Sequence, residues 1–142
     1  MRAMGRTQPD VRVIVHVDGG SRGNPGPAAA GAVLSSPDGE VLERVGERIG
    51  IATNNVAEYQ GLLLGLRRAL ALGATEVEVV NDSELVAKQV NGFYKVKHQD
   101  MKPLHAEALT ALGAFERWQV RSVPRAQNAA ADAMVNAALD RS

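Results

Sequence analysis

Four acidic residues in separate parts of the chain have side chains suited to binding divalent cations. They are Asp18, Glu58, Asp82 and Asp132. Carboxylates that are brought together repel one another unless they are protonated or bind cations. The chain has no cysteine and three histidines, none of them adjacent to another. Oxygen ligands of this kind favour magnesium or manganese over zinc.

A cluster of such carboxylates is suited to phosphodiester hydrolysis. Two ions about 3.5–4 Å apart can activate a water molecule and stabilise the leaving oxygen. Spacing alone leaves a simpler interpretation open. In it, Asp18 and Asp82 only end strands, and Glu58 is a charge at the start of a helix. The two interpretations differ in whether the acids meet, which depends on the elements that carry them.

The first part of the chain predicts an antiparallel meander. Valines at every second position predict a strand from Val11 to Asp18. The glycine- and proline-rich run at 19–27 is expected to be neither helix nor regular strand. Two further strands, at 30–36 and 40–49, flank the turn Pro37-Asp38-Gly39.

Helices and two more strands are expected to follow. Thr53, Asn54 and Asn55 are expected to cap a helix that reaches Gly73. The remaining expected elements are a strand at 77–82, a helix from Ser83 to about Asn91, a helix from Pro103 to about Arg117, a strand at 118–123 with Trp118 in the core, a break at 124–127, and a helix from Asn128 to about Asp140. The predicted fold class is α/β, a mixed five-stranded sheet of three antiparallel and then two parallel strands, flanked by helices.

This topology is expected to bring the acids together. A strand that follows a helix returns parallel to an earlier strand through a right-handed crossover. If the strand at 77–82 pairs with the first strand, Asp18 and Asp82 lie at the carboxyl ends of neighbours, where open α/β sheets bind ligands. Glu58 and Asp132, near the starts of helices, can converge on the same edge.

Composition sets the broad class. The 142 residues suit one domain, predicted at 11–142 after a flexible tail at 1–10. Sixteen basic residues balance sixteen acidic ones, so the net charge points to no particular partner. No apolar run is long enough for a membrane span, and the first residues lack the pattern of a signal peptide. We therefore expect a cytoplasmic monomer that does not bind membranes.

Four segments together resemble type 1 ribonuclease H. The run Asp18-Gly19-Gly20-Ser21-Arg22-Gly23-Asn24-Pro25-Gly26-Pro27 resembles the opening motif of that family. Three further motifs follow in order, at 53–59, 82–86 and 128–132, and the likeness spans about residues 11–140. The resemblance implies a ribonuclease H-like fold and an endonuclease that cuts the RNA strand of RNA–DNA hybrids, leaving 5′-phosphate and 3′-hydroxyl ends.

The resemblance also implies roles for individual residues. Asp18, Glu58, Asp82 and Asp132 would be catalytic and would hold two magnesium or manganese ions, with Asp18 bridging both. The loop backbone at Gly19 and Gly20, together with Glu58, would read the RNA 2′-hydroxyl. The other implied substrate contacts are Asn24, Asn54, Asn55, Ser83 and Asn128. For Asn54 and Asn55, helix capping is the alternative.

Two departures from the family pattern concern cations. The loop at 124–127 lacks the histidine that many members carry, and Arg125 is the nearest cation. The segment at 88–102 is too short for the basic protrusion of some members. It nevertheless holds all four lysines, Lys88, Lys95, Lys97 and Lys102, beside Phe93 and Tyr94. We expect Lys95, Lys97 and Arg125 to contact substrate. The alternative for the lysine segment is a solvated loop whose aromatic side chains fill the core edge, and the alternative for Arg125 is a simple surface arginine.

The subtype resembles that of archaea and of actinobacterial fusion proteins, in which a phosphatase-like domain can follow. Two other functions are compatible with the fold. One is a module that binds hybrids without cutting them, although none of the four carboxylates is missing. The other is a resolvase-like DNA nuclease, a class that lacks the Gly-Asn-Pro-Gly and Thr-Asn-Asn motifs present here.

Overall fold

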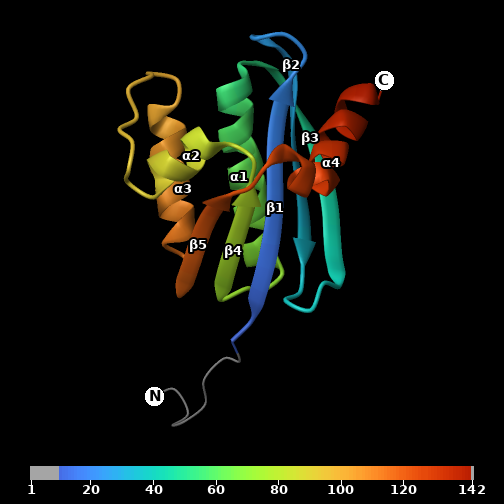
Figure 1. Cartoon of the computed structure of the whole chain (residues 1–142), viewed down its shortest axis with the longest axis vertical. Helices are drawn as coiled ribbons and strands as arrows, with labels where there is room; N and C mark the ends of the chain where they lie inside the picture. The colour runs from blue at the N-terminus through green and yellow to red at the C-terminus, as the bar shows by residue number, and fades with distance from the viewer. Residues whose placement is uncertain (1–9, 142) are drawn as a thin grey trace.

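The computed structural model describes residues 10–141, so the tail predicted for residues 1–10 lies, except for Asp10, outside the described residues. A five-stranded sheet carries four α-helices and one short 3₁₀-helix (Figure 1). In chain order the elements are β1 (Arg12–Ser21), β2 (Gly26–Ser35), β3 (Val41–Ala52), α1 (Asn54–Ala71), β4 (Glu76–Asn81), α2 (Glu84–Val90), α3 (Lys102–Leu112), β5 (Arg117–Ser122), the 3₁₀-helix η1 (Arg125–Asn128) and α4 (Ala129–Asp140).

The sheet has the predicted topology. Its strand order is β3-β2-β1-β4-β5. Strands β1, β2 and β3 pair antiparallel, whereas β4 is parallel to β1 and β5 is parallel to β4. The mixed five-stranded sheet expected from the sequence is therefore confirmed.

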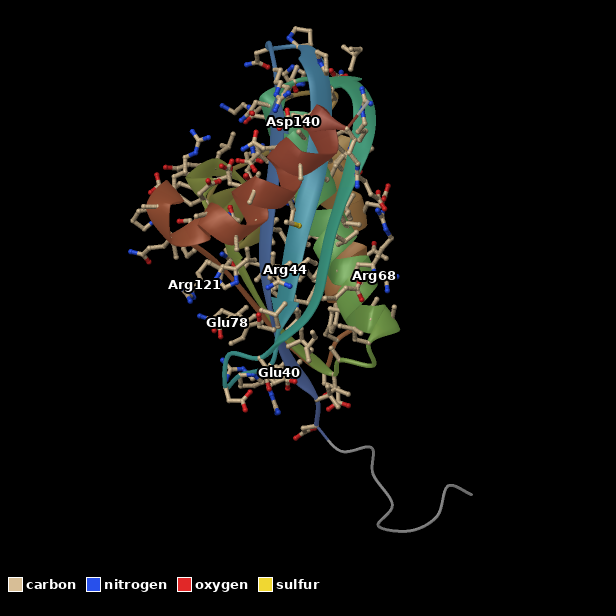
Figure 2. The ribbon with its side chains drawn as sticks, turned by 90° about the vertical axis from the view of Figure 1, so that its right-hand side faces the viewer. Glu40, Arg44, Arg68, Glu78, Arg121 and Asp140 are labelled. Carbon is tan, nitrogen blue, oxygen red and sulfur yellow. The ribbon has the colours of Figure 1, made fainter. Side chains whose placement is uncertain are left out.

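Helices cover the two faces unequally. Side chains of β1, β4 and β5 pack with α1, α2 and α3 in the larger core, which includes Val15, Leu66, Val79 and Leu112. Helix α4 lies on the opposite face, over β1, β2 and β3 (Figures 1 and 2). Small residues allow this close approach, because a Cβ on Gly31 would lie 2.8 Å from the carbonyl oxygen of Ala131.

The glycine-rich run at 19–27 is irregular only at 22–25, and the prediction is wrong for its two ends. Strand β1 continues through Gly19 and Gly20 to Ser21, and these glycines pair with Ala30 and Ala29 of β2. A side chain at Gly19 would collide with α1, because its Cβ would lie 1.8 Å from the carbonyl oxygen of Ala57. Glycine here serves the close packing of strand and helix. The second strand accordingly begins at Gly26 rather than near residue 30, and the third is β3 at 41–52 rather than 40–49.

Two other predictions at the second half of the chain are wrong. Helix α3 ends at Leu112, with Gly113 as its cap, and not near Arg117. Trp118 was expected in the core, but it is 38% exposed because β5 is an edge strand. Over the described part of the chain, no helix combines the length and apolar character that a membrane crossing requires.

Candidate active site

Three of the four predicted acids meet at one edge of the sheet. Asp18 lies in β1 and Asp82 directly follows β4, and these strands are parallel neighbours that end at the same side. Glu58 comes from α1, which approaches β1 closely at Gly61, where a Cβ would lie 2.2 Å from the carbonyl oxygen of Asp18. One carboxylate oxygen from each of Asp18, Glu58 and Asp82 lies within 4.8 Å of the others. We call these three residues the carboxylate edge.

Asp132 lies beside the carboxylate edge rather than within it. It projects from the first turn of α4 into the same groove. Its Oδ2 accepts a hydrogen bond from Asn136 Nδ2 at 3.3 Å, and its Oδ1 lies 3.5 Å from Arg125 Nη2. The fourth acid is thus partly neutralised by neighbours on its own side of the groove.

Negative charge is strongly disfavoured at the carboxylate edge. Burial, followed by the charge of Asp82 and contact with Asp132, raises the pKa of Asp18 to about 7. Burial and the charges of Asp18 and Asp82 raise the pKa of Glu58 to about 9, although the Gly19 N–H donates to Glu58 Oε1 at 3.0 Å. Within residues 10–141, no lysine or arginine forms an ion pair with any of the three. Hard cations would remove this repulsion, so the donor set fits magnesium or manganese.

A groove of about 430 Å³ surrounds the acids. Gly19, Gly20, Asn54 and Arg125, all predicted to contact substrate, line it. Asn24 lies nearby, and its Oδ1 accepts a hydrogen bond from the Asn54 backbone N–H at 3.0 Å. The structure thus brings these predicted contacts to one side of the molecule.

Thr53, and not Asn54 or Asn55, caps helix α1. The side chain of Thr53 caps α1 by accepting from the Val56 N–H at 3.2 Å. Asn54 and Asn55 are the first helical residues, and both are exposed. Their side chains are therefore available to a ligand. Ser83 in turn caps α2, since its hydroxyl accepts from the Val86 N–H at 3.2 Å.

Asn128 does not face the groove, contrary to its predicted contact with substrate. Its side chain is 1% exposed, and Nδ2 donates to the carbonyl oxygen of Val17 at 2.8 Å. This bond ties the start of α4 to the residue before Asp18. Its role is therefore to hold two site-bearing elements together.

The lysine segment lies apart from the groove lining. Lys95 and Lys97 are exposed, and neither lines the groove. Phe93 is 78% exposed and Tyr94 46%, so these aromatic side chains do not fill the core edge. Lys88 Nζ lies 5.0 Å from the centroid of the Tyr94 ring, which fixes one end of the segment.

Sequence reasoning missed several groove residues. They are Ser21 and Arg22 at the end of β1, and Val135, Asn136 and Leu139 on α4. A signal was present, because the three α4 residues follow Asp132 at helical spacings of three, four and seven. The Ser21 hydroxyl is buried and lacks a hydrogen-bond partner among the described residues.

Comparisons with known proteins agree with this geometry. The family model described as reverse transcriptase-like matches residues 16–138. Ribonuclease HI of Halobacterium salinarum is 45% identical over 135 residues, which cover 94% of this chain and 68% of that protein. The crystal structure of RNase H1 from the same archaeon superposes with a TM-score of 0.89 and covers 91% of this chain and 98% of that one. The chain belongs to the type 1 ribonuclease H family.

Other members of the family extend the comparison. Bifunctional protein Rv2228c of Mycobacterium tuberculosis is 49% identical over 131 residues, or 92% of this chain. This ribonuclease H family chain spans only 36% of that mycobacterial protein. A crystal structure of LC11-RNase H1 in complex with an RNA/DNA hybrid is 39% identical, with a TM-score of 0.86, and covers 90% of this chain and 96% of that one.

Proposed function

We propose that this chain hydrolyses the RNA strand of RNA–DNA hybrids, leaving 5′-phosphate and 3′-hydroxyl ends. The observation that carries the proposal is the carboxylate edge, where three acids approach within 4.8 Å without a cationic partner among the described residues. Family membership and the RNA/DNA hybrid bound to the related LC11-RNase H1 support the choice of substrate.

Two magnesium or manganese ions fit this donor set. Asp18, Glu58 and Asp82 would hold them, together with Asp132 from the other wall of the groove. When bound, such ions supply Lewis acidity and lower the pKa of a coordinated water. Asp18 is the most central ligand, since its carboxylate contacts both Glu58 and Asp132 and lies near the charge of Asp82.

Residues of the chain position the nucleic acid. The Gly19 N–H holds Glu58 in place, and the absence of side chains at Gly19 and Gly20 leaves the strand backbone accessible in the groove. Recognition of RNA in a hybrid depends on 2′-hydroxyls in a shallow minor groove, which backbone groups and Glu58 can reach. Asn24, Asn54 and Asn55 form the adjacent polar surface and would contact sugars and base edges.

Cations around the groove would bind phosphates. Arg125 lies at the mouth beside Asp132, with 79% of its side chain exposed, and would steady the strand near the cleaved bond. Lys95 and Lys97, next to the exposed Phe93, would contact the DNA strand through charge and stacking. We also propose that residues 11–142 act as one catalytic domain, as a monomer in the cytoplasm.

Cleavage of an end-labelled RNA–DNA hybrid tests the proposal. Single-stranded RNA, duplex RNA and duplex DNA serve as controls, each with magnesium, manganese or chelator. The Asp82→Asn variant tests the carboxylate edge in the same assay. We expect metal-dependent cutting of the RNA strand of the hybrid, which the variant abolishes, with phosphorylated 5′ ends on the products.

Other outcomes favour the alternatives. Tight hybrid binding without cutting under any metal would indicate a binding module of the same fold. A preference for duplex or branched DNA would indicate a resolvase-like nuclease.

A further inference from the structure

The groove continues past the acids along one face of α4. Asp132, Val135, Asn136 and Leu139 line it, and their spacing places them on one side of the helix over two turns. The opposite wall is a run of consecutive β1 residues that ends at Ser21, followed by Arg22. The groove is therefore longer than the carboxylate cluster needs.

Arg22 lies at the far end of this extension in a fixed position. Its backbone N–H donates to the carbonyl oxygen of Pro27 at 2.8 Å, which closes the loop that carries it. Its Nη2 lies 2.8 Å from Oδ1 of Asp140, the last residue of α4. The Arg22 side chain is nevertheless 49% exposed, so other donors of the guanidinium remain accessible. An arginine held in this way is oriented without being buried.

The charges along the groove suit a polyanionic strand. Arg22 and Arg125 are the two cations among its lining residues. Arg125 lies beside Asp132 and Arg22 beside Asp140. The two acids are eight residues apart on α4, about 12 Å along the helix axis. A strand with one phosphate at the carboxylate edge can therefore place another of its phosphates, about two linkages away, near Arg22.

We propose that Arg22 and the far end of the groove form a second phosphate subsite, for an RNA-strand phosphodiester about two linkages from the cleaved one. This inference rests on the proposed function and extends it. Guanidinium suits the task because its planar donors can bind two phosphate oxygens at once. Asp140 contacts the Arg22 guanidinium through Nη2, so its charge competes with a bound phosphate for this cation.

A purely structural role for the Arg22–Asp140 pair makes different predictions. In that case the pair ties the loop after β1 to the end of α4, and removing either side chain has the same effect. For the subsite, Arg22→Ala raises KM for the hybrid about tenfold at low salt and leaves kcat within about twofold, as expected for one lost phosphate contact. Asp140→Ala keeps KM at or below the wild-type value, because the cation remains and a nearby negative charge is removed.

The matched control is Arg68→Ala. Arg68 pairs with Glu43 and has a similarly exposed side chain (41%), but it lies on α1, far from Asp140 (Figure 2). We expect this variant to keep the wild-type KM. Arg22→Ala should also reduce the slope of log KM against log salt by about one, whereas the control should not.

Neutralising single phosphates locates the contact. In a series of hybrids, each hybrid carries a single methylphosphonate at one of the linkages that flank a defined cut site. The nucleotide on the 5′ side of the methylphosphonate is 2′-O-methylated for chemical stability. Substrates with the same sugar and a normal phosphate are the reference. At one linkage, neutralisation should raise KM about tenfold for the wild type and add nothing for Arg22→Ala. The same scan is read as equilibrium binding in the Asp82→Asn background, so it does not depend on cutting.

The outcomes separate the two proposals. If the wild type cuts hybrids and Arg22→Ala behaves like Arg68→Ala, or if Asp140→Ala raises KM as Arg22→Ala does, the subsite is wrong and the nuclease stands. If neither the wild type nor any variant cuts hybrids, but Arg22→Ala weakens hybrid binding and removes the sensitivity to neutralisation at one linkage, the nuclease proposal fails and the subsite stands. Equal sensitivity of Arg22→Ala and the wild type at every linkage overturns the subsite.

Discussion

The same pair of strands carries acids in two opposite electrostatic states. At the carboxyl ends of β1 and β4 lies the carboxylate edge. Toward their other ends, and reaching onto β5, lies a set of ion pairs between arginines and glutamates that we call the arginine ladder. It consists of Arg12, Glu76, Glu78, Arg117 and Arg121. Figure 2 shows Glu78 and Arg121 of the ladder side by side.

The two regions differ in whether arginines of the chain itself balance the negative charge of the acids. Glu78 contacts Arg121 at 2.9 Å and also pairs with Arg12, and these guanidinium groups lower its pKa. Asp18, at the other end of the same strand pair, has a raised pKa because burial and neighbouring acids disfavour its charge. Acids that the chain neutralises itself stabilise the fold. Acids that it leaves without cations are placed for a ligand that brings them.

Activity should show the largest contrast between the two regions. Asp18→Asn should reduce kcat about 10³-fold or more, because it removes the central metal ligand while keeping the side-chain shape. Glu78→Gln changes an acid to an amide on the neighbouring strand in the same way, yet it should change kcat less than about twofold. Initial rates on a labelled hybrid under saturating magnesium measure both. A large loss for Glu78→Gln would remove the distinction between the regions.

Stability without metal should change in opposite directions for the same variants. In chelator at pH 7, Asp18→Asn should raise Tm by about 3 °C, because it removes a buried charge near other acids. Glu78→Gln should lower Tm by a similar amount, since Arg121 loses its partner and Arg12 loses one of two. Thermal unfolding followed by circular dichroism measures these shifts. Adding magnesium should raise Tm for the wild type and for Glu78→Gln more than for Asp18→Asn.

The pH dependence of stability should follow from the same contrast. Asp18 and Glu58 have folded-state pKa values of about 7 and about 9, above their ordinary values. The folded state therefore binds more protons than the unfolded state above about pH 4, and the free energy of unfolding falls as pH rises toward 9. The lowered pKa of Glu78 acts in the opposite sense: its contribution is present above its ordinary pKa and is lost on acidification.

Unfolding in chelator from pH 5 to pH 9 checks this prediction. Tm of the wild type should decline across the range, and the decline should be shallower for Asp18→Asn. Saturating magnesium should flatten the wild-type profile, because bound cations replace protons at the acids. Identical slopes for the wild type and Asp18→Asn would show that Asp18 is not responsible.

The sequence was sufficient to predict that Asp18, Glu58 and Asp82 meet, because the order and pairing of the elements that carry them could be predicted. Alternating valines locate β1, and the parallel return of β4 puts Asp82 beside Asp18. Strand ends and crossover handedness are governed by local sterics, which a single sequence reports well. The same reasoning predicted the mixed sheet of three antiparallel and two parallel strands.

It could not supply the features that depend on distant contacts. Gly19 looked like a turn residue, yet its role is to let α1 approach β1, which only the packed structure reveals. Asn128 looked like a polar contact for substrate but lies inside, bonded to Val17. Arg22 was not predicted to line the site, because its partner Asp140 lies 118 residues away in the chain. Pairings over such separations leave no local pattern.

The smallest expected effect is a change in KM on replacing exposed cations. It extends the comparison of compensated and uncompensated charges from acids to cations. Arg117 of the ladder is compensated by Glu76 at 3.3 Å and by Asp10 at 3.6 Å. Lys95 and Lys97 form no ion pair with the described residues, so their charge is available to phosphates. Replacing both lysines with alanine should raise KM about threefold to tenfold at low salt and leave kcat nearly unchanged.

Arg117→Ala is the matched control for the lysine variant, and it should lower stability slightly without changing KM. The difference between the two should shrink as salt rises, since screening weakens phosphate contacts and leaves the chemical step unaffected. Michaelis curves on one hybrid at several salt concentrations measure it. If the lysine variant keeps the wild-type KM at low salt, exposed charge without a partner is not enough to mark a binding surface in this protein. The inference that a charge without a partner marks a binding site would then hold only for buried charges, for which the lack of a partner costs free energy.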